Sequence, residues 1–107
     1  MSASNGALSP SKGFIMAFFV YIIRCADGSY YVGHAENVAL RIKIHNDGGG
    51  AKYTFLRRPV SLAYSEPAES IIQAIRRERQ IKGWTRAKKE ALITGDLELL
   101  KRLSRKS

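Results

Sequence analysis

The strongest constraint on the fold is an almost continuous run of apolar and aromatic residues from Ala17 to Cys25. Such a run is typical of a strand that is buried on both faces of a sheet. Ala26-Asp27-Gly28 has the composition of a turn, and Ser29 to His34 forms the return strand. The sequence therefore predicts an antiparallel β-hairpin at the centre of the fold.

The length of the turn decides whether Tyr21 and Tyr31, one on each strand, share a face of the sheet. A two-residue turn at Asp27-Gly28 would place the two rings on opposite faces. A three-residue loop with Gly28 in the left-handed region places them on the same face, and glycine in the third loop position favours this arrangement. The same register sets Gly33 opposite Tyr21 and leaves space beside the backbone for a ligand.

The rest of the chain predicts one more strand and several helices. The expected segments are a helix from Asn37 to about Asn46, a mobile loop over residues 47–58, a strand from Val60 to Tyr64, a helix from Glu66 to about Lys82, a helix from Thr85 to about Ile93 and a helix from Leu97 to Leu103. Asn37 and Thr85 are suited to cap helices, and Pro67 suits the first position of one. The order ββαβαα plus a C-terminal helix predicts an α+β fold, a three-stranded antiparallel sheet flanked by helices.

Length and cysteine content predict one intracellular domain. A chain of 107 residues that is 45% apolar can bury a modest core. We expect a disordered leader over residues 1–15, the folded domain over 16–94 and a basic C-terminal helix or tail over 95–107. The lone Cys25 excludes an internal disulfide and indicates a cytoplasmic location. No apolar run approaches the roughly 18 residues that a membrane span needs.

The charge balance points to a polyanionic partner. The chain carries 18 Lys and Arg against 9 Asp and Glu, a net charge of +9, and nucleic acid is a more common partner of such a domain than a membrane surface. A merely soluble cationic surface is the alternative. The residues expected to hold a DNA backbone lie in the predicted loop and in the helix after Thr85: Lys52, Tyr53, Thr54, Arg57, Arg58, Arg86, Lys88 and Lys89.

Three ionisable residues fall inside the apolar faces of the predicted helices. Arg41 and His45 lie within the arc that Leu40, Ile44, Val38 and Ile42 define, and Glu78 lies within the arc of Ala74 and Ile81. An unpaired charge on a buried face costs roughly several kcal/mol, so such a residue is expected to be paired or to have a function. Two interpretations remain open: a buried Arg41–Glu78 ion pair, or a functional polar pocket between the helices and the sheet.

These residues resemble the GIY-YIG nucleases in order and spacing. The triplets Phe19-Val20-Tyr21 and Tyr31-Val32-Gly33 are variants of the two that give the family its name. Arg41, His45 and Glu78 match the family's arginine, its His-or-Tyr position and its metal-binding glutamate. The resemblance covers about Ala17 to Ile93. It is closest to small stand-alone bacterial proteins and extends to the nuclease modules of DNA repair and of homing endonucleases.

The resemblance implies metal-dependent hydrolysis of phosphodiester bonds in DNA with low sequence specificity. Glu78 would bind Mg²⁺ or Mn²⁺, and Arg41 would stabilise charge on the scissile phosphate. Tyr21, Tyr31 or His45 would take the proton from the attacking water, with nearby cations lowering the tyrosine pKa; the sequence does not choose among them. A non-catalytic nucleic-acid-binding module with the same fold is the first alternative, and a structural protein with an ion-pair network is the second.

Overall fold

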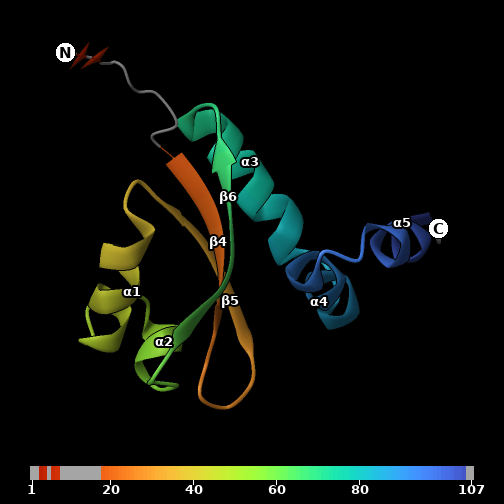
Figure 1. Cartoon of the computed structure of the whole chain (residues 1–107). Coiled ribbons are helices and arrows are strands. Elements are labelled where there is room, and N and C mark those ends of the chain that lie inside the picture. The colour runs from red at the N-terminus through yellow and green to blue at the C-terminus, as the bar shows by residue number, and fades with distance from the viewer. Residues whose placement is uncertain (1–2, 5, 8–17, 106–107) are drawn as a thin grey trace.

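The computed structural model describes residues 3–4, 6–7 and 18–105 (Figure 1). Its elements in chain order are β1 (Ala3–Ser4), β2 (Gly6–Ala7), β4 (Phe18–Arg24), β5 (Tyr30–Ala35), α1 (Val38–Asn46), α2 (Lys52–Phe55), β6 (Ser61–Ala68), α3 (Ile71–Lys82), α4 (Arg86–Thr94) and α5 (Leu97–Arg105). β1 and β2 form a short parallel pair. Of the expected leader over residues 1–15, residues 1–2, 5 and 8–15 lie outside the described residues. The domain boundaries stay predictions. No helix in the described ranges is long and apolar enough to cross a membrane.

The main sheet has three antiparallel strands in the order β5-β4-β6, which confirms the predicted fold class. β4 is the central strand, and side chains pack on both of its faces. Val20, Tyr21, Ile22 and Ile23 are almost completely buried. The almost unbroken apolar run is therefore explained by the helices that pack on both faces of this strand.

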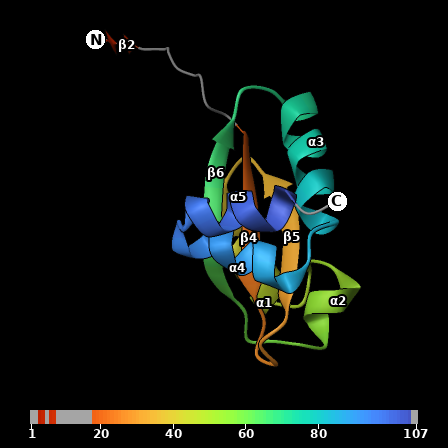
Figure 2. The ribbon, with the colours of Figure 1, turned by 90° about the vertical axis from the view of Figure 1, so that its right-hand side faces the viewer.

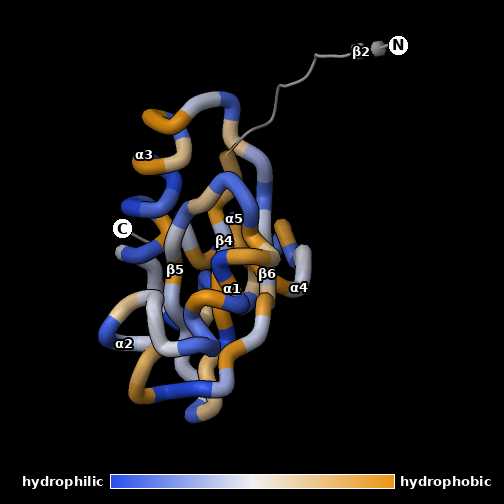
Figure 3. Tube along the Cα trace, turned by 90° about the vertical axis from the view of Figure 1, so that its left-hand side faces the viewer, coloured by the Kyte–Doolittle hydropathy of each residue, from blue (hydrophilic) through white to orange (hydrophobic). Residues whose placement is uncertain are grey.

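Helices cover the two faces of the sheet separately. Val20 and Ile22 pack against α3 and α4 on one face, whereas Tyr21 and Ile23 pack against α1 on the other. Figure 2 shows α4 and α5 in front of the strands, and Figure 3 shows α1 in front of them from the opposite side. α1 and α3 therefore lie on opposite faces of the sheet.

The hairpin has the predicted three-residue loop. The backbone N–H of Cys25 donates to the carbonyl of Ser29 at 2.8 Å, and Gly28 has a φ of +86°. Tyr21 is paired with Gly33 and Ile23 with Tyr31, so both tyrosines lie on the α1 face. The predicted shared face, and the glycine opposite Tyr21, are confirmed.

The start of the helix predicted at Glu66-Pro67 is wrong. Pro67 lies in β6, where it is paired with Phe19, and the helix begins at Ile71 with Ser70 as its N-cap. The Ser70 hydroxyl accepts a hydrogen bond from the Gln73 N–H at 3.1 Å. β6 has a partner on one side only, and an edge strand tolerates a proline that lacks an N–H. The third strand is therefore longer than the predicted Val60–Tyr64.

The predicted inward face of α1 is also wrong in part. The helix packs on the sheet through Val38, Ile42 and His45, which leaves Leu40 52% exposed. On α3, Ala74 and Ile81 are buried as expected, whereas the first turn carries exposed isoleucines. That apolar first turn is orange in Figure 3. The sheet is narrow, so each helix buries only the strip that lies directly over a strand.

The segment predicted to be a mobile loop, residues 47–58, contains the short helix α2. Thr54 in this helix is completely buried and faces the sheet side of α1. The Asn46 side chain, expected on the solvent side of α1, is turned toward Val60. It accepts a hydrogen bond from the Val60 N–H at 2.7 Å and donates one to the Val60 carbonyl at 2.9 Å. These contacts hold the segment against the body of the protein.

Candidate active site

A hydrogen-bonded chain of three buried side chains links β4, α1 and α2. The Tyr21 hydroxyl lies 3.2 Å from Nε2 of His45, and Nδ1 of the same ring lies 2.7 Å from Oγ1 of Thr54. His45 is only 2% exposed. The three residues are far apart in the sequence, and the fold brings them together on the α1 face of the sheet.

The direction of each hydrogen bond follows from Thr54. Its hydroxyl donates its only proton to the carbonyl of Ala51 at 3.0 Å, so the same oxygen is left to accept a hydrogen bond from His45. Nδ1 of His45 therefore carries the proton, and Nε2 is the acceptor. The Tyr21 hydroxyl donates to Nε2, which makes His45 a base directed at the phenol.

Two glycines give the rings of this chain their space. A Cβ atom at Gly33 would lie 2.5 Å from the Tyr21 hydroxyl oxygen, and one at Gly50 would overlap the His45 imidazole, 2.7 Å from its Cγ atom and nearer still to Nδ1. Any larger side chain at either position forces a ring to move. Gly33 and Gly50 are thus explained by the close approach of the Tyr21 and His45 rings to the backbone at these positions.

Electrostatics keeps both groups neutral in the resting protein. Burial raises the pKa of Tyr21 to about 12, and the positive charge of Arg41 only partly opposes this. Burial also lowers the pKa of His45 below its usual value of 6.5, and Arg41 adds to this effect. The expectation that cations lower the tyrosine pKa is therefore wrong for Tyr21, because desolvation of the phenolate outweighs the nearby charge.

Arg41 lies at the rim of this site rather than inside the protein. Its side chain is exposed, which corrects the expectation of a buried position, and it forms no ion pair with Glu78. It borders a hollow of about 400 Å³, the catalytic hollow, whose lining residues are Tyr21, Tyr31, Arg41, Ile44, His45, Gly49, Gly50 and Ala51. A guanidinium in this position is free to meet an anion that enters the hollow.

Glu78 approaches from the other face of the sheet, around the edge of β5. Its carboxylate is paired with Nδ1 of His34 through one oxygen and with Nζ of Lys82 through the other, at 2.8 Å for the lysine. Burial alone would raise the pKa of the Glu78 carboxyl, but the hydrogen bonds from Lys82 and His34 outweigh it and lower the pKa below its usual value. Glu78 is therefore ionised, and its partners are His34 and Lys82 instead of Arg41.

The donor set at Glu78 fits one kind of metal better than others. In the described ranges, no three His, Cys, Asp or Glu side chains are grouped to hold an ion, which argues against a zinc-type site. A single ionised carboxylate suits Mg²⁺, which keeps several waters and takes phosphate oxygens as ligands. Lys82 occupies one carboxylate oxygen, and its half-exposed side chain has room to swing away.

Tyr31 differs from Tyr21 in its partners. Its ring packs edge-on against His45 and stacks on the Tyr53 ring, with 6.0 Å between the two tyrosine ring centroids. The Arg57 guanidinium lies over the Tyr53 ring, 3.8 Å from its centroid. Within residues 18–105, no hydrogen bond engages the Tyr31 hydroxyl. Tyr31 therefore joins the catalytic hollow to the aromatic and cationic surface of α2, whereas Tyr21 belongs to the proton-carrying chain.

The predicted phosphate-binding residues fall into two groups on opposite faces. Lys52, Tyr53, Arg57 and Arg58 lie on α2 and the turn after it, which follow directly on Ala51 in the lining of the catalytic hollow. Arg86, Lys88 and Lys89 lie on α4, across the sheet. Arg86 is further tied to Glu90 and to the carbonyl of Gly28, at 2.9 and 2.8 Å. Thr54 is buried and bound to His45, so it is not part of a nucleic-acid surface.

Sequence reasoning missed Thr54, Gly50, His34 and Lys82 as parts of the site. The glycine run beside His45 was the one available signal, because repeated glycine near a helix end marks close approach of backbone and side chain. Lys82 gave no signal, since it is an ordinary polar residue at the end of α3.

Residues 17–91 match the profile of the GIY-YIG catalytic domain. The chain belongs to the GIY-YIG family. This is a nuclease superfamily, and the matched range contains both tyrosine triplets, Arg41, His45 and Glu78. The recognition made from the sequence is confirmed.

The chain is also similar to curated bacterial proteins and to solved structures. A UPF0213 protein of Staphylococcus aureus strain Mu3 is 53% identical over 75 residues, which cover 70% of this chain and 92% of the relative. The solution structure of EF2693 from E. faecalis is 35% identical with a TM-score of 0.50, covering 72% of this chain and 82% of the other. The UPF0213 protein BH0048 from Bacillus halodurans is 43% identical with a TM-score of 0.47 over the same shares.

Proposed function

We propose that this protein is an endonuclease that hydrolyses phosphodiester bonds in DNA, with Tyr21 and His45 acting together as the general base. The observation that carries the proposal is the directed chain from Tyr21 through His45 to Thr54, which opens into a hollow beside a free guanidinium. A merely structural ion-pair network does not need a neutral histidine aimed at a phenol. The family assignment supports a nucleic-acid substrate.

The proton path follows from the hydrogen bonds. As the oxygen of a water molecule bonds to phosphorus, the water gives a proton to the Tyr21 oxygen, and Tyr21 passes its own proton to Nε2 of His45. Tyr21 therefore returns to a neutral phenol, and His45 becomes an imidazolium. The pKa of about 12 makes the phenol oxygen strongly basic once its proton moves away. The bond from phosphorus to the leaving deoxyribose oxygen breaks, and that oxygen takes a proton from solvent.

Arg41 is proposed to hold the phosphate during this step. The guanidinium is exposed at the border of the catalytic hollow, and the fork of N–H donors matches two phosphate oxygens. Its charge opposes the negative charge that develops on the phosphate as the water attacks. Tyr31, in the same hollow, is proposed to orient the substrate through its ring rather than to take a proton.

A divalent metal ion is proposed to bind at Glu78. When bound, Mg²⁺ or Mn²⁺ supplies a Lewis acid for the phosphate oxygens. Glu78 holds the ion as an ionised carboxylate, and His34 keeps that carboxylate oriented through its other oxygen. Lys82 is proposed to leave the Glu78 carboxylate as the substrate enters. Its side chain is half exposed, and a phosphate of the substrate becomes its new partner.

A non-catalytic nucleic-acid-binding module is a second candidate, and the Lys82–Glu78 pair is the observation that favours it. A lysine in that position already neutralises the carboxylate, as a metal ion would. In this case the protein would bind DNA through α2 and Arg41 without cutting it. The two candidates differ in one observable, the cleavage of bound DNA in the presence of metal.

The experiment that separates them is a cleavage assay on supercoiled plasmid and on labelled oligonucleotides, with Mg²⁺, Mn²⁺ or EDTA. The proposal predicts metal-dependent cleavage that Glu78→Gln abolishes while DNA binding persists. Glu98→Gln is the control, because it removes one carboxylate from the exposed surface of α5. DNA binding with no cleavage in any metal would establish the binding module instead.

A further inference from the structure

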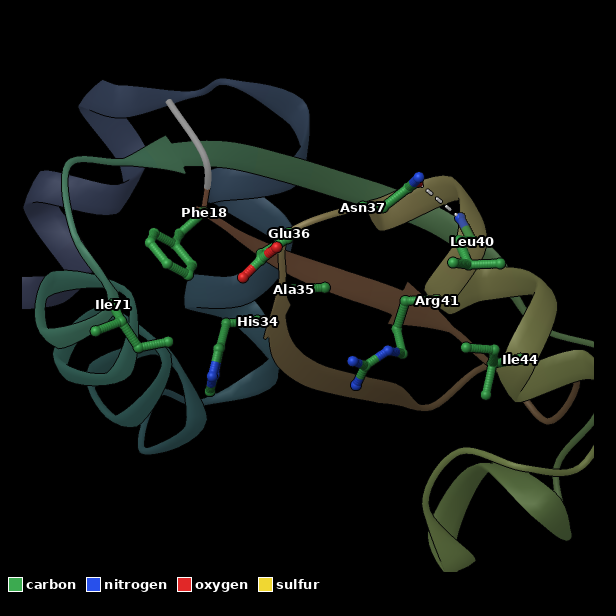
Figure 4. A pocket seen from close by; sticks show the side chains of 9 residues that line it. All are labelled: Phe18, His34, Ala35, Glu36, Asn37, Leu40, Arg41, Ile44 and Ile71. Atoms are coloured by element: carbon green, nitrogen blue, oxygen red, sulfur yellow. Dashed lines mark hydrogen bonds between the residues drawn. The ribbon is translucent and has the colours of Figure 1, made fainter. Parts of the chain in front are cut away.

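A second hollow lies beside the catalytic one, between α1 and the first turn of α3. It measures about 450 Å³, within the range of about 300–1,000 Å³ that is usual for pockets for small organic ligands. Its walls include apolar side chains from four elements, and Figure 4 shows Phe18 and Ile71 on one side of it and Leu40 and Ile44 on the other. We call it the α1–α3 hollow.

The α1–α3 hollow and the catalytic hollow share a border. Arg41 and Ile44 line both of them. Figure 4 shows the Arg41 guanidinium projecting from α1 into the space between the two helices. A phosphate that Arg41 holds in the catalytic hollow therefore has its attached nucleoside within reach of the α1–α3 hollow.

The chemistry of the lining does not suit a second phosphate. Glu36 contributes a carboxylate to the hollow, and within residues 18–105 no hydrogen bond or ion pair engages it. A carboxylate accepts hydrogen bonds only and repels a phosphate. Of the charged donors in the lining, His34 is already paired with Glu78, and Arg41 is shared with the catalytic hollow, where it is proposed to hold the substrate phosphate. The fitting occupant is flat, largely apolar and equipped with N–H donors.

We propose that the α1–α3 hollow binds an unpaired nucleobase adjacent to the phosphate held by Arg41, with the amino and imino N–H groups of the base donating to Glu36. The inference rests on the proposed nucleic-acid substrate and adds which part of that substrate is read. The Phe18 ring offers an aromatic surface for stacking. The base must be unpaired because Glu36 takes the donors that pairing would use.

The two oxygens of Glu36 discriminate among the bases. Guanine presents two neighbouring N–H donors on its pairing edge, which match both oxygens of one carboxylate. Adenine and cytosine present an amino group beside a ring acceptor, so only one oxygen gains a partner. Thymine presents a single N–H between two carbonyls, which the carboxylate repels. Guanine is therefore the preferred base, and thymine is the least favoured.

The test measures binding to short, labelled oligothymidylates that carry one central guanine, adenine, cytosine or thymine, using the full chain in EDTA. The expected result is about tenfold tighter binding of the guanine oligonucleotide than of the all-thymine one. Glu36→Gln should reduce this preference to about twofold or less, because the amide keeps one acceptor only. Glu98→Gln, the charge-matched control, should keep the full preference.

A second pair of variants tests the space itself. Ile71→Trp fills the α1–α3 hollow and should remove the guanine preference, whereas Ile72→Trp enlarges a neighbouring exposed residue that does not line the hollow and should keep it. Both isoleucines are partly exposed, so neither ring has to enter the core. Equal binding of all four oligonucleotides, or a guanine preference that survives Glu36→Gln, would overturn the proposal. An apolar protein partner as the true occupant gives the first of these results.

Cleavage of the same oligonucleotides with Mg²⁺ separates this inference from the proposed function. Cleavage without a base preference rejects the nucleobase site and leaves the hydrolysis standing. A guanine preference without cleavage rejects the hydrolysis and leaves the nucleobase site as the reading element of a binding module.

Discussion

The positions of single glycine residues set the geometry of the proposed general base. Gly50 touches the His45 ring, and Gly49 beside it would place a Cβ in ordinary contact with Ile44, at 3.4 Å. Gly50→Ala should destabilise the fold by about 1–3 kcal/mol, the usual effect of overpacking, and should lower activity further than the stability loss explains. Gly49→Ala should change stability by less than about 0.5 kcal/mol.

Chemical denaturation of both glycine variants checks this prediction, since they differ by one position and carry the same added methyl group. Similar unfolding free energies for the two would contradict the described contact between Gly50 and His45.

The depressed pKa of His45 makes stability depend on pH. The unfolded chain binds a proton on this histidine near pH 6.5, whereas the folded protein resists protonation because the ring is buried and lies near Arg41. Unfolding is therefore favoured as pH falls below 6.5, and this loss ends below the folded-state pKa. Thermal melts from pH 7.5 to 5 should show this loss in the wild type and a flatter profile in His45→Gln. Parallel profiles for the two proteins would speak against a neutral, buried His45.

Among the elements, α1 is tied through one of its side chains to Val60, the residue just before β6. Asn46 makes two hydrogen bonds to the backbone of Val60, a residue that is 5% exposed. Asn46→Ala leaves a buried N–H and a buried carbonyl without partners, and each costs about 1–3 kcal/mol. We expect a loss of about 2–4 kcal/mol in the free energy of unfolding.

The control for Asn46 is Lys43→Ala, which removes an exposed Lys43–Asp47 pair from the same helix. Such pairs contribute about 0.3–0.5 kcal/mol. Urea titrations of both variants measure the difference, and a loss at Asn46 no larger than the loss at Lys43 would show that α1 is held by other contacts.

The accuracy of sequence reasoning varied from element to element for physical reasons. The hairpin was predictable because loop length, Gly28 and strand parity are local properties. Pro67 misled because a proline suits both a helix start and an edge strand, and the position of β6 at the edge is a property of the whole sheet. The α1 face was misjudged because Leu40 and Ile44 border a hollow, where the apolar pattern does not report burial.

The sequence named some residues of the candidate site but not their pairing. Tyr21, Arg41, His45 and Glu78 were all identified from the sequence, with Arg41 and Glu78 expected in one pocket. The sheet separates the helices that carry them, so Glu78 is paired with His34 and Lys82. Helical periodicity gives the face of a helix on which a residue lies, but it does not give the side of the sheet on which that helix packs.

For the whole molecule, the distribution of charge decides which face binds nucleic acid. The net charge of +9 predicts binding that weakens steeply with salt. Neutralising Lys52 and Arg58, near the catalytic hollow, should reduce the salt slope by about 1–2 units, because each phosphate that a cation neutralises adds about 0.7–0.9 to the slope. Neutralising Lys88 and Lys89 on α4 should change the slope less, because the sheet separates them from the hollow.

The test compares two double variants of equal net charge, one with Lys52 and Arg58 changed to Gln and one with Lys88 and Lys89 changed to Gln. DNA-binding titrations at several salt concentrations give the salt slope of each. A larger effect from the α4 pair would move the nucleic-acid surface to the opposite face and would contradict the proposed site.

The central claim is that Tyr21, through His45, takes the proton from the attacking water. The most direct measurement is the single-turnover rate of DNA cleavage with saturating protein and Mg²⁺, for Tyr21→Phe and Tyr30→Phe. Each variant loses one phenol hydroxyl and one hydrogen bond, and Tyr30 lies on the opposite face, bonded to Glu90 at 3.1 Å. Tyr21→Phe should lower the rate by about 100- to 10,000-fold with DNA affinity unchanged, and Tyr30→Phe by less than about tenfold. Equal rates for the two variants would contradict the account.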